Sequence, residues 1–340
     1  MIDRPAVGFV RDKEPLSMTS AASSAIPVTV LTGYLGAGKT TLLNRILSED
    51  HGKKYAVIVN EFGEVGIDND LVVDTDEEIF EMNNGCICCT VRGDLIRILE
   101  GLMKRKGKFD AVIIETTGLA DPAPVAQTFF MDDEVRAKTR LDAIVTVVDA
   151  KNLMARIEDS PEAEDQVAFA DVILLNKVDL VDAEELARVK AEILAINPQA
   201  RIVETERCAV DLGEVLDRGA FDLDRILLVE PEFLVADHHS HDETVKSISL
   251  EAGDMEPEPF FEWVNRATQE QGPNIRRMKG IIAFKGDPER YVVQGVHMIV
   301  EGNHQRDWKP DEERRTRLVF IGRDLDFAAL KAGFEACKAA

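Results

Sequence analysis

Three cysteines fall within four residues of this chain, at Cys86, Cys88 and Cys89. Thiolates are preferred ligands of Zn²⁺ and of other soft or borderline metal ions, which take four ligands in a tetrahedral arrangement. The segment Asn83–Gly85 before them is typical of a turn, and the spacing brings the first and last thiol together on it. The cluster therefore predicts a three-thiolate metal site that needs a fourth ligand.

The fourth ligand is expected from outside the cluster. A structural zinc site usually draws its ligands from two separated knuckles, whereas the sequence shows one here. Glu61 and Glu64 follow the second predicted strand and could supply a carboxylate, or the ligand could be exogenous. An incomplete ligand set suits a metal ion that must arrive and leave. Two other interpretations stay open, namely buried structural cysteines and a redox-active thiol pair.

A glycine-rich loop about fifty residues upstream, Gly33–Thr40, matches the pattern G-x-x-x-x-G-K-[ST]. The apolar run Val28–Leu31 precedes it and an amphipathic helical pattern follows it, which is the order that phosphate binding requires. Loop N–H groups point at phosphate oxygens, Lys39 should reach the β- and γ-phosphates, and the Thr40 hydroxyl should bind Mg²⁺. The residues expected to hold the nucleotide here are Gly33, Gly36, Ala37, Gly38, Lys39, Thr40 and Thr41.

A second nucleotide motif, N-K-x-D, indicates which base is bound. Asn176, Lys177 and Asp179 follow the apolar run Val172–Leu175, so they lie at the end of a predicted strand. A carboxylate at the last position accepts two hydrogen bonds from the N1–H and N2–H groups of guanine. Adenine offers no such pair, and a site built for a paired polar contact rejects an analogue that lacks it. GTP is therefore favoured over ATP.

A third element ends the apolar run Val112–Ile114 with the carboxylate of Glu115. This is the Walker B pattern, which supports Mg²⁺ directly or through water. The role of Glu115 stays open between direct ligand, water-mediated ligand and base. Gly118 lies three residues further on, where its N–H could approach the γ-phosphate. No glutamine is placed like the water-positioning one of small GTPases, so slow intrinsic hydrolysis is expected. Lys39, Thr40 and Glu115 are the predicted catalytic residues.

The elements that must position these motifs alternate between strand and helix as far as about residue 203. Near-continuous apolar strands are typical of a parallel sheet that is buried on both faces, so we predict a doubly wound α/β domain. The predicted strands are Val28–Leu31, Ala56–Asn60, Ala111–Glu115, Ala143–Val148, Val172–Leu175 and Arg201–Val203. The predicted helices are Leu42–Leu47, Leu95–Met103, Val125–Phe130 and Ala183–Ile196.

The pattern changes beyond residue 228. A polar segment with the histidine run His238–His241 reads as a linker, and the run could also gather metal for the thiol cluster. A small α+β domain is predicted after it, with His297 packed on a strand face. Its predicted strands are Val245–Leu250, Ile275–Lys285, Tyr291–Val300 and Arg317–Gly322, and its predicted helices are Pro259–Thr268 and Phe327–Cys337. In the first of these helices Phe260, Phe261, Val264 and Ala267 share one face.

Composition limits the classes of partner. The chain has 340 residues, enough for two domains, and 63 acidic against 40 basic residues give a net charge of −23. That balance argues against binding to nucleic acid or to an anionic membrane. No run of eighteen apolar residues predicts a transmembrane helix. Five cysteines, three of them clustered, do not form a disulfide framework, which favours a reducing cytoplasm. Cys208 and Cys337 stand alone and are expected to be structural.

Taken together, these motifs resemble the CobW family of metallochaperone GTPases, which are relatives of the hydrogenase and urease nickel-insertion GTPases. The resemblance covers about residues 27–337. In the first domain it rests on Gly33–Asn44, Asn60–Asp68, Asn84–Cys89, Glu115–Pro122 and Asn176–Asp179. In the second domain it rests on Arg277–Gly280, Val293–His297 and Leu318–Gly322.

The resemblance implies a GTP-hydrolysing metallochaperone. Proteins of this family bind Zn²⁺ or Co²⁺ at the C-x-C-C site when loaded with Mg²⁺ and GTP, and hydrolysis is thought to release the metal to a client metalloprotein. Cys86, Cys88 and Cys89 would then be metal ligands, with Glu61 as a further one, and Asn60–Asp68 would be a switch that senses GTP. If GTP tightens metal binding, metal must tighten GTP binding by the same factor.

Other functions are weighed beside the zinc chaperone. A cobalt chaperone in cobalamin biosynthesis would use the same three thiolates. A GTP-linked metal storage or sensing module would hold metal without transferring it, and an unrelated GTPase could carry redox-active thiols. The expected organisation is a disordered leader at 1–25, a P-loop GTPase domain at 26–228, a histidine-containing linker at 229–243 and a C-terminal α+β domain at 244–338. The protein is expected to be a monomer or a homodimer.

Overall fold

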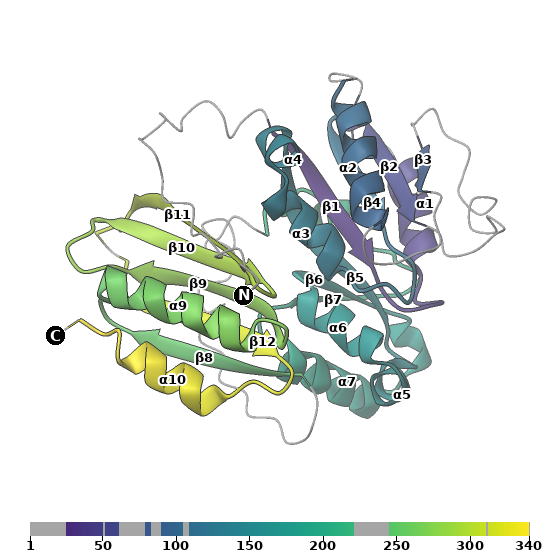
Figure 1. The fold of residues 1–340 in the computed structure, drawn as a ribbon. Helices are drawn as coiled ribbons and strands as arrows, with labels where there is room; N and C mark the ends of the chain where they lie inside the picture. Colours follow the sequence, from purple (N-terminus) through teal and green to yellow (C-terminus); the bar gives the residue numbers. More distant parts are fainter. Residues whose placement is uncertain are drawn as a thin grey trace, which may run out of the picture. The chain divides into compact units, whose positions relative to one another are not determined.

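The computed structural model describes residues 25–49, 52–60, 79–82, 90–104, 109–220, 245–310 and 312–339 (Figure 1). These residues fall into two compact units, one on each side of the gap between 220 and 245. Each unit has its own sheet and its own core, and each is described by itself below. Among the described residues, no helix is both long enough and apolar enough to cross a bilayer.

The first unit is built on a seven-stranded sheet in the order β3-β2-β4-β1-β5-β6-β7. Every neighbouring pair is parallel, which confirms the predicted α/β fold class. The strands are β1 Ile26–Thr32, β2 Tyr55–Asn60, β3 Ile79–Met82, β4 Ala111–Glu115, β5 Thr139–Asp149, β6 Val172–Asn176 and β7 Arg201–Thr205. Strand β3 was not predicted, because four residues at a sheet edge give too short a pattern to recognise.

Helices cover both faces of this sheet (Figure 1). They are α1 Lys39–Ser48, α2 Thr90–Met103, α3 Ala123–Met131, α4 Asp133–Lys138, α5 Leu153–Asp159, α6 Pro161–Phe169 and α7 Ala183–Ile196, with 3-10 turns η2 Val178–Leu180 and η3 Leu212–Glu214. Prediction found α1, α2, α3 and α7 but missed α4, α5 and α6. Helices α4 and α5 are short, and α6 buries residues all round its axis, so it shows no polar stripe.

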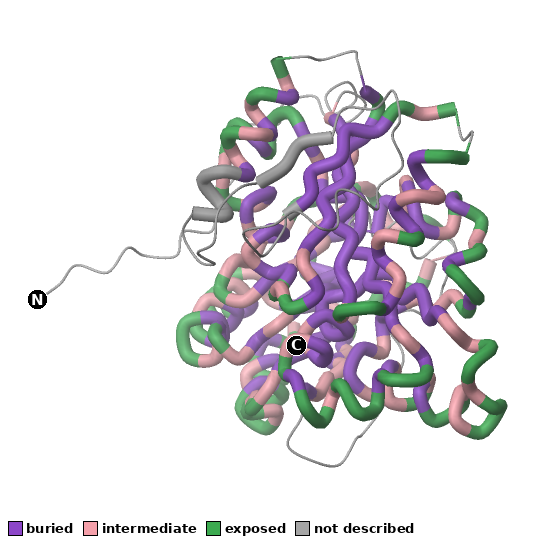
Figure 2. The backbone as a smooth tube through the Cα atoms, turned by 90° about the vertical axis from the view of Figure 1, so that its right-hand side faces the viewer, coloured by how far each residue is buried: buried purple, intermediate pink, exposed green. Residues whose placement is uncertain are grey.

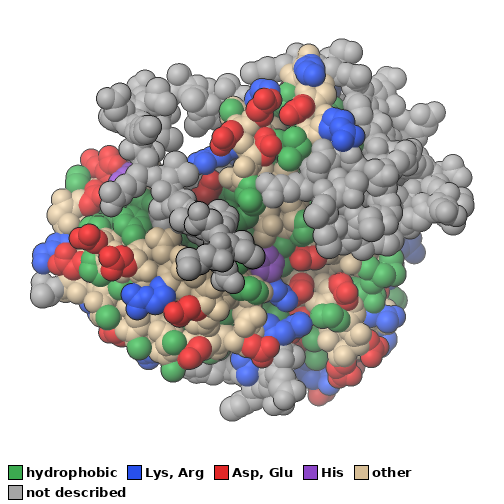
Figure 3. Space-filling view, viewed as in Figure 1, with side chains coloured by type: hydrophobic (Ala, Val, Ile, Leu, Met, Phe, Trp, Pro, Cys, Tyr) green, Lys and Arg blue, Asp and Glu red, His purple; other side chains and the backbone are tan. Residues whose placement is uncertain are grey.

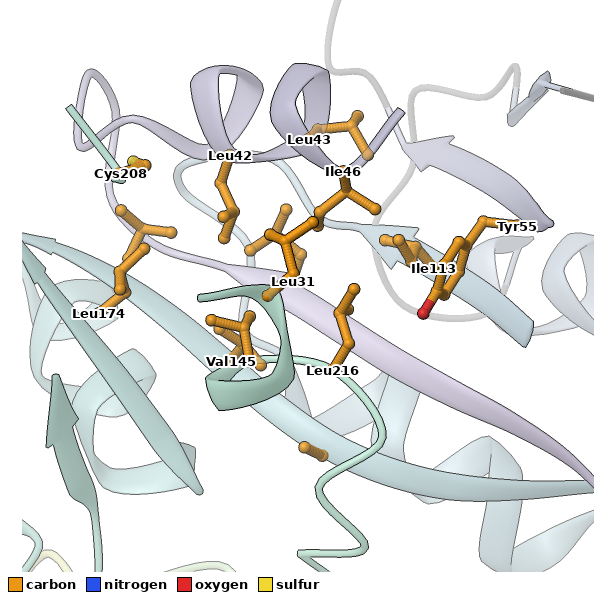
Figure 4. Close-up of a cluster of buried hydrophobic side chains, with 14 of the residues drawn as sticks. Leu31, Leu42, Leu43, Ile46, Tyr55, Ile113, Val145, Leu174, Cys208 and Leu216 are labelled. Atoms are coloured by element: carbon orange, nitrogen blue, oxygen red, sulfur yellow. The ribbon is translucent and has the colours of Figure 1, made fainter. Parts of the chain in front are cut away.

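The core on one face of the sheet lies between α1 and the central strands (Figure 4). Leu42 and Ile46 of α1 pack on Leu31 of β1 and Val145 of β5, and all four side chains are almost fully buried. Figure 2 shows the buried backbone following the central strands, with exposed positions on the surrounding helices and loops. This packing fixes the start of α1 at the carboxyl end of β1.

The second unit has a five-stranded antiparallel sheet in the order β11-β10-β9-β12-β8. The strands are β8 Lys246–Ala252, β9 Ile275–Ala283, β10 Glu289–Val296, β11 Ile299–Asp307 and β12 Thr316–Gly322, and the helices are α9 Pro257–Gln271 and α10 Phe327–Glu335. The predicted helix face is confirmed, because Phe260, Val264 and Ala267 are buried and Phe261 packs against the same core. The α+β class of this unit is therefore as predicted.

One prediction for this sheet was wrong. The segment expected to be a single strand, Tyr291–Val300, is two strands joined by a two-residue hairpin, since Val296 pairs with Ile299. His297 lies in the turn with φ 54° and not on a strand face. Apolar residues continue to alternate through the turn, which concealed it, and two-residue hairpins are recognised from Asn-Gly or Gly residues that are missing here. Strand β11 is a polar edge strand and was missed for the same reason.

Candidate functional site

The three predicted nucleotide motifs meet at one edge of the parallel sheet. Strands β1, β4 and β6 end at Thr32, Glu115 and Asn176, and parallel strands bring their carboxyl ends to the same edge. The register pairs Leu31 with Glu115, so the loop after β1 lies next to the end of β4. Ligands of open α/β sheets bind outside the carboxyl ends of the strands, which is where these motifs lie.

The glycine-rich loop is closely packed on its inner side. A Cβ atom on Gly33, where φ is 140°, would lie 2.2 Å from the carbonyl oxygen of Val147. A Cβ atom on Gly38, where φ is 120°, would lie 2.6 Å from Nδ2 of Asn176. Both the backbone conformation and the lack of space therefore require glycine at these two positions.

Helix α1 begins directly after this loop, at Lys39, and no described side chain caps its start. Uncapped N–H groups and the helix dipole favour an anion at this position. The Lys39 ammonium is buried and donates to the carbonyl oxygens of Gly33 at 2.7 Å and Tyr34 at 3.4 Å, so it is held over the loop. Thr40 is half-buried and Thr41 is exposed at the helix start. The loop thus has the arrangement that phosphate binding needs.

The loop after β4 follows the buried Glu115 carboxyl group. The Thr116 hydroxyl donates to Oγ1 of Thr32 at 2.8 Å, which ties this loop to the end of β1. Gly118 lies against the phosphate loop, since a Cβ atom there would be 2.6 Å from Cδ2 of Leu35. The predicted Mg²⁺ and γ-phosphate residues are therefore next to the glycine-rich loop.

Gln166 of α6 anchors the same loop, and sequence reasoning missed it. Its Nε2 group donates to the carbonyl oxygens of Gly118 and Ala120, each at 3.1 Å, and its own carbonyl oxygen accepts from the Thr146 hydroxyl at 2.8 Å. The side chain is almost fully buried. It also lines a pocket of about 50 Å³ between the glycine-rich loop, the end of β5 and α5. No local pattern marks Gln166, because α6 has no polar stripe.

The N-K-x-D motif is bonded directly to the glycine-rich loop. Nδ2 of Asn176 donates to the carbonyl oxygen of Ala37 at 2.9 Å, and Oδ1 of Asn176 accepts from the backbone N–H of Cys208 at 2.9 Å. The Lys177 ammonium donates to the carbonyl oxygen of Gly36 at 2.8 Å. Asp179 is exposed in η2, on the same edge. Two motifs that are far apart in the sequence are thus one site.

Asp149 at the end of β5 completes this connection and was not predicted. Its Oδ2 atom accepts from the Lys177 ammonium at 2.7 Å. Burial raises the pKa of Asp149, but the hydrogen bonds from Lys177 and Asn152 outweigh it, and the net pKa lies below its ordinary value. The carboxylate is therefore ionised at neutral pH and holds Lys177, whose φ is 63°, in its left-handed conformation.

Cys208 lies beneath the glycine-rich loop (Figure 4). It is fully buried, and its thiol donates to the carbonyl oxygen of Gly38 at 3.4 Å. Burial raises the pKa of this thiol to about 11, so it is neutral at physiological pH. Arg45 of α1 donates to the carbonyl oxygen of the same residue. Cys208 was predicted to be structural, but its position beside the glycine-rich loop was not predicted, because 170 residues separate Cys208 from Gly38 in the sequence.

The predicted metal site lies outside the described residues. This holds for Cys86, Cys88, Cys89, Glu61 and Glu64, and also for the Asn60–Asp68 loop beyond its first residue and for the histidine run at 238–241. Within the described part of the chain, no three His, Cys, Asp or Glu side chains gather as metal ligands would. On the described part of the face in Figure 3, acidic and basic side chains are interspersed. The three-thiolate site stays a prediction.

Comparison with known proteins agrees with this arrangement. Residues 27–204 match the family model for the CobW/HypB/UreG nucleotide-binding domain, and residues 245–338 match that of the cobalamin synthesis protein cobW C-terminal domain. The chain is 38% identical to the zinc chaperone CobW of Pseudomonas aeruginosa, over 94% of this chain and 93% of that protein. It is 36% identical to the zinc-regulated GTPase metalloprotein activator 1 of Schizosaccharomyces pombe, over 88% and 83%.

A solved structure is similar over both units. The crystal structure of Zn(II)-bound YjiA GTPase from Escherichia coli aligns with a TM-score of 0.75 at 30% sequence identity. The alignment covers 93% of this chain and 99% of that one. An α/β unit and an antiparallel unit like those of this chain therefore occur together in a protein of similar length.

Proposed function

Since the chain belongs to the CobW/HypB/UreG family, we propose that it is a GTP-hydrolysing metallochaperone that binds Zn²⁺ and delivers it to a client metalloprotein. The observation that carries the proposal is the pair of hydrogen bonds by which Asn176 joins Ala37 of the glycine-rich loop to Cys208. A guanine-reading motif that is bonded to a phosphate loop makes a mononucleotide site. Metal transfer is the part of the proposal that the relatives' names support.

The preference for GTP rests on Asp179. Its carboxylate is exposed at the sheet edge, three residues after Asn176, where it can accept from the N1–H and N2–H groups of guanine. Binding of ATP would leave that carboxylate desolvated without donors, which is costly. The nucleotide-contacting residues in this proposal are those of the glycine-rich loop together with Gly118, Asn176, Lys177 and Asp179.

Magnesium fits the residues at this edge. The hydroxyl of Thr40 and the carboxylate of Glu115 are hard oxygen donors next to an uncapped helix start, and Mg²⁺ takes such donors together with phosphate oxygens. When bound, Mg²⁺ would neutralise charge that develops on the phosphate oxygens. Lys39 would bind the same oxygens, and Gln166, by holding the carbonyl of Gly118, would aim the loop N–H groups at the γ-phosphate.

Zinc is the proposed cargo, with Cys86, Cys88, Cys89 and Glu61 as its ligands. The support comes from the thiol spacing and from the zinc-related names of the relatives. Three thiolates also accept Co²⁺, so the choice between the two metals must be measured. Hydrolysis of GTP would lower the affinity of a site that otherwise holds zinc too tightly to release it.

The test is a zinc titration of the wild-type chain with a non-hydrolysable GTP analogue and with GDP, at buffered free-metal concentrations. We expect a tighter zinc affinity in the GTP state and its loss in Cys88→Ala. Cys337→Ser is the matched control, because Cys337 is buried in the second unit and should leave zinc binding unchanged.

The outcomes separate the competing functions. Equal zinc affinity in both nucleotide states would reject a GTP-controlled chaperone. Tight zinc binding with no transfer to an apo-metalloenzyme during hydrolysis would favour the storage or sensing module. A preference for Co²⁺ at matched free-metal levels would point to the cobalt chaperone instead.

A further inference from the structure

The turn after β7 has a backbone conformation that its residues do not favour. Arg207 and Cys208 both have positive φ, 51° and 57°, and the N–H of Ala209 donates to the carbonyl oxygen of Glu206 at 2.9 Å. Two consecutive central residues with positive φ and this hydrogen bond are the pattern of a type I′ turn. Such turns are dominated by Gly, Asn and Asp, so contacts from elsewhere must hold this one in place.

Arg45 of α1 is one of those contacts. Its guanidinium group donates through Nη1 to the carbonyl oxygen of Cys208 and through Nη2 to the carbonyl oxygen of Val210 at 3.1 Å. Nε is held by the carboxylate of Glu49 at 2.6 Å. A planar fork that binds two carbonyl groups fixes both the position and the orientation of the chain between them, which a lysine cannot do.

The turn is also part of the guanine side of the site. Asn176 accepts from the N–H of Cys208, and the register pairs Asn176 with Thr205, the last residue before the turn. The turn therefore lies beside the motif whose Asp179 reads the N1–H and N2–H edge. Because O6 adjoins N1–H on the same edge of guanine, a base held by Asp179 would turn O6 toward the backbone of this turn, which would form the wall there.

Arg45 thus links two parts of the site that are remote in sequence. It lies on the helix whose first turn binds phosphate, and 163 residues separate it from Cys208. The Cys208 thiol reaches back to the carbonyl oxygen of Gly38 at that helix start. We propose that Arg45 is a positioning residue: it locks the Glu206–Ala209 turn to α1, so that the O6 wall and the phosphate loop hold the nucleotide as one unit. This rests on the proposed GTP site.

The experiment compares Arg45→Met and Arg45→Lys with wild type. Glu49→Gln serves as the matched control, because it removes the charge of the exposed partner of Nε and Nη2 while both donors to the turn stay in place. Release of a fluorescent GDP is measured by stopped flow. Loss of a charged hydrogen-bonding group costs enough to make release roughly tenfold faster in Arg45→Met. Arg45→Lys should be intermediate, and Glu49→Gln should stay within about twofold of wild type.

Affinities for base analogues distinguish a positioning role from general destabilisation of the protein, which would weaken all nucleotides equally. Inosine triphosphate keeps O6 and N1–H, whereas 2-aminopurine riboside triphosphate lacks both, so each loss in a variant is measured relative to wild type with the same nucleotide. We expect Arg45→Met to weaken GTP and inosine triphosphate alike and to weaken the 2-aminopurine nucleotide clearly less.

Two results would overturn the proposal: unchanged GDP release in Arg45→Met, or an equal loss for all three nucleotides. The melting temperature without nucleotide shows whether Arg45→Met folds. If it does not fold, the same GDP-release and analogue measurements on Arg45→Lys test the proposal. Failure of the proposed function is distinguishable, since wild type itself would then bind GTP no better than ATP. If wild type prefers GTP but the Arg45 variants behave like wild type, only the proposed role of Arg45 is rejected.

Discussion

The side-chain amide of Asn176 lies 2.9 Å from the carbonyl oxygen of Ala37, although 139 residues separate them. This hydrogen bond joins the end of β6 to the loop after β1, and the two strands are not neighbours, because β5 lies between them. The contact is therefore made above the sheet edge by the loops alone. Both partners are almost fully buried, so the bond is worth more than an exposed one.

Replacing Asn176 should damage both the fold and the nucleotide site. Asn176→Ala leaves the Ala37 carbonyl and the Cys208 N–H without their partner, and each buried group left unsatisfied costs about 1–3 kcal/mol. We expect a loss of at least about 2 kcal/mol in the free energy of unfolding and a large drop in GTP affinity. Denaturant titration and calorimetry measure the two effects. Asn303→Ala, at an exposed position of β11, is the control and should change neither.

Two glycines of the phosphate loop should respond differently to alanine. At Gly36 a Cβ atom meets nothing within 4 Å, so Gly36→Ala costs only the left-handed conformation, about 1–2 kcal/mol. At Gly38 the Cβ atom would also lie 2.6 Å from Nδ2 of Asn176, so the variant adds a clash and breaks the bond to Ala37. Unfolding free energies without nucleotide should therefore fall more for Gly38→Ala. Equal losses would show that the Asn176 contact contributes nothing there.

Gln166 should control the difference between GTP and GDP. Gln166→Ala releases the carbonyl oxygens of Gly118 and Ala120, and with them the loop beside the γ-phosphate position. We expect GTP affinity to fall by roughly fivefold or more, in line with the loss of one or two neutral hydrogen bonds, while GDP affinity stays within about twofold. Equilibrium binding of both nucleotides measures this. Gln305→Ala, an exposed glutamine of β11, is the control, and a parallel loss for GDP would contradict the expectation.

The Cys208 thiol should make stability depend on alkaline pH. Burial raises its pKa to about 11 from a value of 9.0. In the unfolded chain the thiol ionises first, so its contribution is complete below pH 9 and is lost as the pH rises from 9 to 11. At about 1.4 kcal/mol per pKa unit, a shift of two units corresponds to a loss on the order of 3 kcal/mol.

A serine variant isolates that effect. Cys208→Ser cannot ionise in this range, so its unfolding free energy should fall less than that of wild type between pH 8.5 and pH 10.5. Circular dichroism with denaturant, fitted for the first unit, measures both proteins. The same pH slope for the two would mean that another group is responsible.

The sequence predicted those parts of the candidate site that belong to short local motifs. Gly33–Thr40, Glu115 and Asn176–Asp179 were each recognised within a few residues, and each lies at a strand end as expected. Gln166 and Asp149 were missed because neither belongs to a short motif, and they act through contacts with residues 48 and 28 positions away. In the second unit, His297 was misplaced because alternating apolar residues continue through its turn.

The sequence by itself determined the class of the fold and the chemistry of the motifs, because apolar periodicity and glycine spacing depend on neighbouring residues. Only the tertiary structure decided that Asn176, Arg45 and Cys208 form one network with the phosphate loop. That network depends on the strand order, which places β5 beside β1 and β6 next to β5 on its far side. Strand order follows from how whole faces of helices and sheet bury one another, and no local pattern records it.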